Sequence, residues 1–130
     1  QSRVEGLIEA RMNDKTNSND AGFDAKLDQL RQAFADELVK RLGALAEGMA
    51  EFDAADIDAD RAAALSTLEE RAHVLAGSRA LFGYPEIGAA AGALEEASGN
   101  GVGAPSAPNT ESSVRGSWAR LRAAADDIKN

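Results

Sequence analysis

The longest regular pattern of apolar residues lies between Asp24 and Phe52. Its apolar members recur every three or four residues: Leu27, Leu30, Phe34, Leu38, Leu42, Leu45, Met49 and Phe52. Because a helix has about 3.6 residues per turn, side chains with this spacing share one face. The pattern predicts a long helix with one buried face, and it assigns Met49 and the phenylalanines to the core.

A shorter pattern of the same kind precedes this helix. Residues Arg3 to Met12 place apolar side chains at helical spacing, which predicts a short amphipathic helix. The following residues, 13–22, are mostly Asn, Asp, Ser, Thr and Gly, a composition typical of a mobile connection. We therefore divide the chain into residues 1–22, a short N-terminal helix with its linker, and residues 23–130, the main domain.

Three more helical patterns follow. One runs over residues 59–82 and is expected to end at Gly83, since glycine can adopt the left-handed conformation that stops a helix. The next begins at Pro85, because proline suits a first helical turn, and the last begins near Thr110 after a polar loop over 98–109. Together these elements predict an all-α fold, an antiparallel up-down-up-down four-helix bundle with a short extra N-terminal helix.

Four aspartates crowd the connection before the helical pattern of residues 59–82: Asp53, Asp56, Asp58 and Asp60. Their spacing lacks the Gly and the closing bidentate Glu of an EF-hand calcium loop. Capping of the next helix by Asp58, with Ile57 as a hydrophobic staple, explains them instead. We therefore predict no metal site here.

Composition narrows the function classes. The chain has 130 residues, enough for one domain with a real core, and its hydrophobic content of 44% with 5% aromatics favours helices over sheets. It has no cysteine, which removes disulfides and thiolate chemistry, and a net charge of -8, which argues against nonspecific nucleic-acid binding.

No apolar run is long enough to span a bilayer and no signal-peptide pattern is present, so we expect a cytoplasmic protein without membrane contact. Since the chain begins at Gln1 rather than Met, we expect an excised piece or a processed product.

His73 is the only histidine of the chain. In a helix it shares a face with Ala76, Gly77 and Ala80. The opposite face carries an apolar stripe: Leu65, Leu68, Ala72, Leu75 and Phe82. This pattern predicts an exposed imidazole over a patch of very small side chains, which a partner's surface could approach closely.

The residues around His73 carry a family resemblance. The positions concerned are His73, Leu75, Gly77, Ser78, Phe82-Gly83, Ile87 and Leu94-Glu95. Their spacing resembles that of the histidine-containing phosphotransfer (HPt) domains of bacterial phosphorelays, whose pattern is roughly His-x-Leu-Lys-Gly-Ser, then an apolar-Gly pair, then Leu-Glu one helix later. The family's usual Lys is Ala76 here.

The resemblance implies a phosphohistidine carrier without kinase or nucleotide-binding activity of its own. His73 would attack in line through Nε2, and Glu70, Ala76, Gly77 and Ala80 would contact the receiver domain of a response regulator or hybrid histidine kinase. That partner would supply the magnesium ion, so we expect no cofactor on this chain, which we expect to be a monomer. Related chemotaxis-kinase domains have a glutamate at the position of Glu95, which could orient the imidazole through Nδ1–H; a solvated surface glutamate is the alternative.

Two other functions are considered for a helical chain with this histidine. Ala76 cannot neutralise a phosphoryl group as lysine can, and Arg71 and Arg79 are rotated away from the face of His73. The chain could therefore be a non-catalytic helical-bundle adaptor that binds or sequesters a receiver domain. A histidine-kinase dimerisation domain is disfavoured, because that family usually has an acidic residue and then a proline after its histidine, and Val74-Leu75-Ala76-Gly77 has neither.

Overall fold

The computed structural model describes residues 3–78, 81 and 83–129, without the side chains of residues 3–21, 128 and 129. This part of the chain holds four helices and no strand: α1 (Arg3–Ala54), α2 (Asp58–Ala76), α3 (Pro85–Gly101) and α4 (Pro108–Lys129). The predicted all-α class is confirmed. The chain divides into two compact units, residues 1–33 and residues 34–130, and the second unit contains the bundle.

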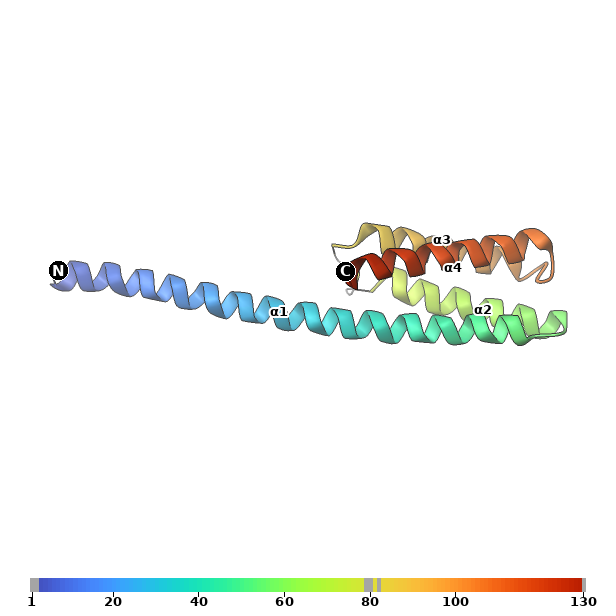
Figure 1. Ribbon diagram of the computed structural model, residues 1–130, viewed down its shortest axis with the longest axis horizontal. Coiled ribbons are helices and arrows are strands. Elements are labelled where there is room, and N and C mark those ends of the chain that lie inside the picture. Colours follow the sequence, from blue (N-terminus) through green and yellow to red (C-terminus); the bar gives the residue numbers. More distant parts are fainter. Residues whose placement is uncertain (1–2, 79–80, 82, 130) are drawn as a thin grey trace. The chain divides into compact units, whose positions relative to one another are not determined.

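Within residues 34–130 the four helical segments run alternately in opposite directions, as Figure 1 shows. α2 packs along α3, and α3 packs along α4. The second half of α1 contributes to the same core, and this arrangement is the antiparallel bundle expected from the short connections between the helices.

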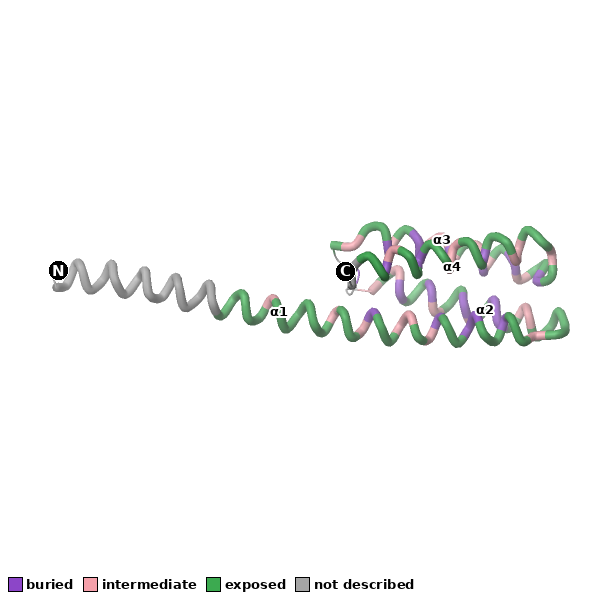
Figure 2. Tube along the Cα trace, viewed as in Figure 1, coloured by how far each residue is buried: buried purple, intermediate pink, exposed green. Residues whose placement is uncertain are grey.

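The core lies where the buried faces of the helices meet (Figure 2). Its largest fully buried side chains are Leu45, Phe52, Leu65, Leu68, Leu75, Ile87, Leu94, Val114 and Leu121. The predicted stripe of α1 is buried at Leu38, Leu45, Met49 and Phe52, but Leu30, in the first unit, is 51% exposed. Burial therefore follows the sequence pattern in the part of α1 that belongs to the second unit.

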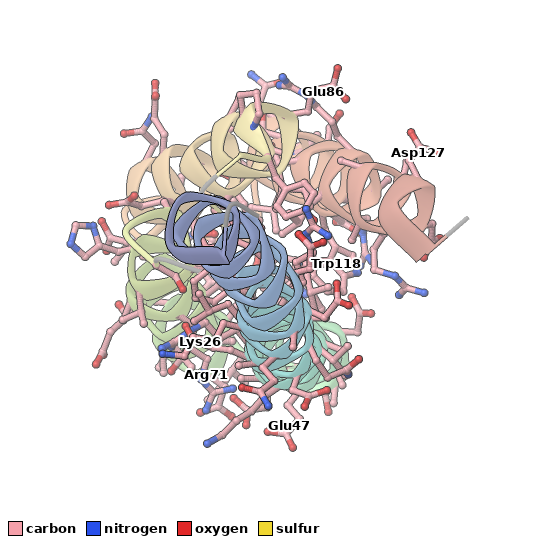
Figure 3. All side chains as sticks on the ribbon, turned by 90° about the vertical axis from the view of Figure 1, so that its left-hand side faces the viewer. Lys26, Glu47, Arg71, Glu86, Trp118 and Asp127 are labelled. Carbon is pink, nitrogen blue, oxygen red and sulfur yellow. The ribbon has the colours of Figure 1, made fainter. Side chains whose placement is uncertain are left out.

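α1 and α2 approach each other closely in the middle of the bundle. A Cβ atom at Gly48 would lie 2.8 Å from Leu68 Cδ2, so only glycine fits this contact without a shift. Arg71 of α2 donates a hydrogen bond from Nη1 to the carbonyl oxygen of Ala44, at 2.6 Å, and its guanidinium lies 4.0 Å from Glu47. Figure 3 shows the labelled Arg71 and Glu47 on the same side of the molecule. These contacts fix α2 against α1.

The end of the bundle that holds the connection between α3 and α4 is tied together by Arg61. Its guanidinium stacks over the ring of Phe52, 4.2 Å from the centroid, and its Nε donates to the carbonyl oxygen of Pro105 at 3.2 Å. Nη2 also lies 3.7 Å from Glu111. One side chain therefore joins α1, α2, the connecting loop and α4.

The expected separate N-terminal helix and turn-rich linker do not occur, because α1 is helical through residues 13–22. That stretch has no proline, the residue that most strongly opposes a helix interior, so none of its residues forbids a continuous helix. The two compact units meet between Ala33 and Phe34, not at residue 22.

The end of α2 also differs from the prediction. The helix ends at Ala76 instead of Phe82: the N–H of Gly77 donates to the carbonyl oxygen of His73 at 3.1 Å, and the N–H of Ser78 to that of Leu75 at 3.0 Å. Gly83 has a φ of 90°, as expected for a left-handed glycine, but it lies in the turn before α3. His73 is consequently in the last turn of α2.

The remaining boundaries shift by smaller amounts. α3 begins at Pro85 as predicted, whereas α4 begins at Pro108 and α3 extends to Gly101, so the loop between them is shorter than expected. Asp58 does not cap α2: Ile57 occupies that position without a side-chain cap, and Asp58 accepts a hydrogen bond from the Ser106 hydroxyl at 2.6 Å. Among the residues described, no group of acidic or histidine side chains is placed to hold a metal ion.

Candidate functional site

His73 extends into solvent from the last turn of α2, with 74% of its side chain exposed. Its neighbours Ala72 and Leu75 are completely buried in the core. Burial of these two residues sets the rotation of the helix, and the rotation turns His73 outward. The predicted exposure of the imidazole therefore agrees with the structure.

Glu95 of α3 contacts the imidazole directly. Its Oε2 lies 2.8 Å from Nδ1 of His73, and the side chain of Glu95 is 32% exposed. Leu94, one position earlier, is completely buried and holds α3 in the rotation that brings Glu95 to the ring. With the proton on Nδ1, the ring donates to Glu95, and Nε2 keeps its lone pair.

The face beside the ring is built of small side chains. Ala76 is half-buried and Gly77 is exposed, while a Cβ atom at Gly77 would meet only the carbonyl oxygen of His73, at 3.6 Å. Glu70, one turn before His73, is exposed. Ala80, the other residue assigned to this face, lies outside the described residues. The structure thus places Glu70 and Ala76 on the part of α2 that carries His73, and Gly77 directly after it.

A groove between α2 and α3 lies next to this site, and the sequence analysis did not identify it. It has a volume of about 510 Å³ and is lined by Glu69, Glu95, Glu96, Asn100, Gly92 and Gly99. The carboxylate of Glu69 lies against the backbone of Gly99, where a Cβ atom would overlap it. The position of Glu69, four residues before His73, is the one signal in the sequence that places it on this face.

The segment that follows α2 is fastened to α1. The hydroxyl of Ser78 donates to Oε2 of Glu37 at 2.6 Å, and the same carboxylate oxygen accepts a hydrogen bond from Nε of Arg41 at 3.1 Å. These hydrogen bonds, the one from Ser78 above all, lower the pKa of Glu37. Ser78 matched the family pattern in sequence, but its partner on α1 is 41 residues away and could not be inferred.

The basic side chains described on α2 are engaged elsewhere. Arg71 binds α1 and Arg61 binds the far end of the bundle. Arg79 lies outside the described residues. Among the contacts of His73 that the structure describes, the charged partner is a carboxylate.

An exposed, oriented imidazole can attack a group that another macromolecule presents at its surface. Open faces of this kind differ from small-molecule sites, which are usually concave and enclose most of the ligand. The described part of the chain contains no helix long and apolar enough to cross a membrane. The exposed ring is accessible to a group presented by another macromolecule.

Comparison with known proteins agrees with this geometry. A family model described as "Hpt domain" matches residues 29–130, a range that includes His73 and Glu95. No curated protein and no solved structure matches the chain.

Proposed function

Because the chain belongs to the Hpt domain family, we propose that it is a phosphohistidine carrier that exchanges a phosphoryl group between His73 and the aspartate of a receiver domain. Membership of the family establishes the coarser function, a histidine-phosphotransfer role in a phosphorelay. The roles of His73 and Glu95 and the identity of the partner as a receiver domain belong to our proposal. The observation that carries it is the exposed imidazole of His73 with Nδ1 held 2.8 Å from Glu95.

The transfer needs a nucleophile that is also a good leaving group. Nε2 of His73 attacks the phosphorus of an aspartyl phosphate in line, a P–N bond forms, the P–O bond to the aspartate breaks, and its electron pair returns to the carboxylate. The reverse sequence passes the group to a second aspartate. The receiver contributes the magnesium ion, so this chain needs only to present the ring.

Glu95 acts in this scheme as a positioning residue. Accepting a hydrogen bond from Nδ1–H selects the tautomer in which Nε2 is unprotonated, and it stabilises the positive charge that the ring acquires when Nε2 is phosphorylated. Nitrogen chemical shifts of the imidazole test this role. They should report the Nδ1–H tautomer in the wild type and a shift toward Nε2–H in Glu95→Ala, with Glu96→Ala as the matched control.

Incubation with a phosphorylated receiver domain tests the function itself. A carrier acquires acid-labile, base-stable phosphate, and His73→Gln acquires none. Phosphate on another residue, or label that persists in His73→Gln, would contradict the assignment of His73.

Ala76 favours one alternative, a helical-bundle adaptor that binds a receiver without accepting phosphate. The same incubation separates the two functions, because an adaptor forms a complex with the receiver but leaves His73 unlabelled. Binding is measured in parallel by titration calorimetry, with His73→Gln expected to retain it in both cases.

A further inference from the structure

Several carboxylates lie on the helices around His73. Glu69 and Glu70 precede it by one turn of α2, Glu95 contacts its ring, and Glu96 lines the same groove as Glu69 and Glu95. The C-terminal end of α2 adds to this field, because the last carbonyl groups of a helix carry a partial negative charge of about half an electron.

Ala76, one turn after His73 and at the position where the resemblance places a lysine, brings no positive charge to the site. The guanidinium groups of Arg61 and Arg71 are bound to other parts of the bundle, as described above. The ring therefore has a described contact with a carboxylate, which repels a phosphoryl group, while the two arginines of α2 form their described contacts with other groups.

Resting on the function proposed above, we infer that this chain is a phosphoryl donor with high transfer potential, whose equilibrium with its receiver lies on the side of the phosphorylated receiver. A phosphoryl group brings up to about two negative charges to Nε2. Oε2 of Glu95 lies 2.8 Å from Nδ1 of the same ring, which is well inside one Debye length, roughly 8 Å at physiological ionic strength, so its charge is incompletely screened. Transfer removes that charge from the face: the P–N bond breaks, its electron pair returns to Nε2, and a P–O bond forms on the receiver's aspartate.

The equilibrium constant is the quantity that isolates this effect. It depends on the free energies of the separate phosphorylated and unphosphorylated proteins, so a variant that changes only docking alters the rates in both directions and leaves the constant unchanged. If Glu70 or Ala76 only contacted the receiver, its substitution would therefore leave the equilibrium constant unchanged.

The experiment mixes the full chain with a phosphorylated receiver domain that transfers to it and measures the equilibrium ratio of phosphohistidine to phosphoaspartate. Ala76→Lys should shift the constant about threefold to tenfold toward phosphohistidine, since a cation one turn away attracts the phosphoryl group across a partly screened surface. Glu70→Gln, which removes one carboxylate, should shift it in the same direction by a smaller factor.

Ala63→Lys is the matched control. Ala63 is an exposed position of α2, and it lies ten residues before His73, roughly 15 Å along the helix. It brings the same change in net charge and should leave the constant within about a factor of 1.5, because a charge at that distance is screened. Raising the salt concentration to about 1 M should remove most of the difference between Ala76→Lys and the wild type.

Three results would overturn this inference without affecting the proposed function. The first is an equilibrium constant that is unchanged in both Ala76→Lys and Glu70→Gln, and the second is a shift in Ala63→Lys as large as that in Ala76→Lys. The third is a shift toward the phosphorylated receiver in Arg79→Ala that equals in size the opposite shift in Ala76→Lys. The last result would identify a cation that already serves the site. Failure of wild-type His73 to accept phosphate would overturn the proposed function as well, and it is recognised before any constant is measured. Circular dichroism of each variant confirms that the bundle is folded.

Discussion

Replacing Gly77 with alanine should slow phosphotransfer without destabilising the bundle. Gly77 is the residue after α2, four positions beyond His73, and it has φ of -92° and ψ of 5°. This backbone conformation is open to any L-residue. A Cβ atom there meets only the carbonyl oxygen of His73, at 3.6 Å, which is an ordinary van der Waals contact.

We expect Gly77→Ala to raise the stability of the bundle and to lower the rate of phosphotransfer. Alanine at a compatible glycine position restricts the unfolded chain and should raise the free energy of unfolding by about 0.4–1 kcal/mol. The new methyl group stands on the approach to the imidazole, where a docked surface must come within bonding distance of Nε2. If the docked interface packs as densely as a protein core, an added methyl group costs about 1–3 kcal/mol, which is roughly a fivefold to 150-fold loss of rate.

Two measurements check this prediction. Urea denaturation gives the stability of Gly77→Ala, and single-turnover transfer from a phosphorylated receiver gives the rate. Gly116→Ala on α4 is the control, since its Cβ enters open space and it lies outside the site; it should transfer at the wild-type rate. Wild-type transfer by Gly77→Ala would refute the view that glycine is needed here for clearance.

Three further predictions concern the scaffold. Gly48→Ala should be less stable than Gly43→Ala by about 1–3 kcal/mol in urea denaturation, because a Cβ at residue 48 would overlap a buried leucine of α2 while residue 43 has open space. Arg61→Met should lower the free energy of unfolding by about 1–3 kcal/mol, because it removes the charged hydrogen bond to the loop between α3 and α4; an unchanged denaturation midpoint would contradict that role. Hydrogen bonds from Ser78 and Arg41 lower the pKa of Glu37 below its ordinary 4.5, so their stabilising effect is fully present above that pH and is lost as the pH falls through the lowered value. The stability deficit of Glu37→Gln should accordingly be seen at pH 7 and should shrink steadily below pH 4.5, whereas a deficit that does not depend on pH would refute this assignment.

The features predicted correctly from sequence are those encoded by local periodicity. The exposed face of His73 followed from the buried positions around it, Ala72 and Leu75, which obey the helical repeat. The end of α2 was predicted six residues too late because the apolar repeat continues through Phe82, beyond the last helical residue. Periodicity reports which face would be buried if the helix continued, and it contains no information on where backbone capping ends it.

Contacts between residues that are far apart in the sequence could not be predicted, for a different reason. Arg61 and Pro105 are 44 residues apart, and Ser78 and Glu37 are 41 apart, so their pairing depends on the packing of whole helices. Glu95 was an exception, because the resemblance to a known family supplied a long-range relation that the local pattern lacks. Its contact with His73 in the structure is the relation that the resemblance suggested.

Holding one exposed ring in place requires contacts on several sides of the helix that carries it. Arg71 fixes α2 to α1, Ser78 fixes the segment after the helix to the same neighbour, and Glu95 of α3 holds the imidazole itself. None of the three contacts involves Nε2 of His73. Arg71 bonds to a backbone carbonyl of α1, Ser78 bonds to a carboxylate of α1, and Glu95 bonds to Nδ1 of the ring. An enclosing pocket would hold the ring equally well but would keep out a receiver domain, so an open site supported from the scaffold is what transfer between two proteins requires.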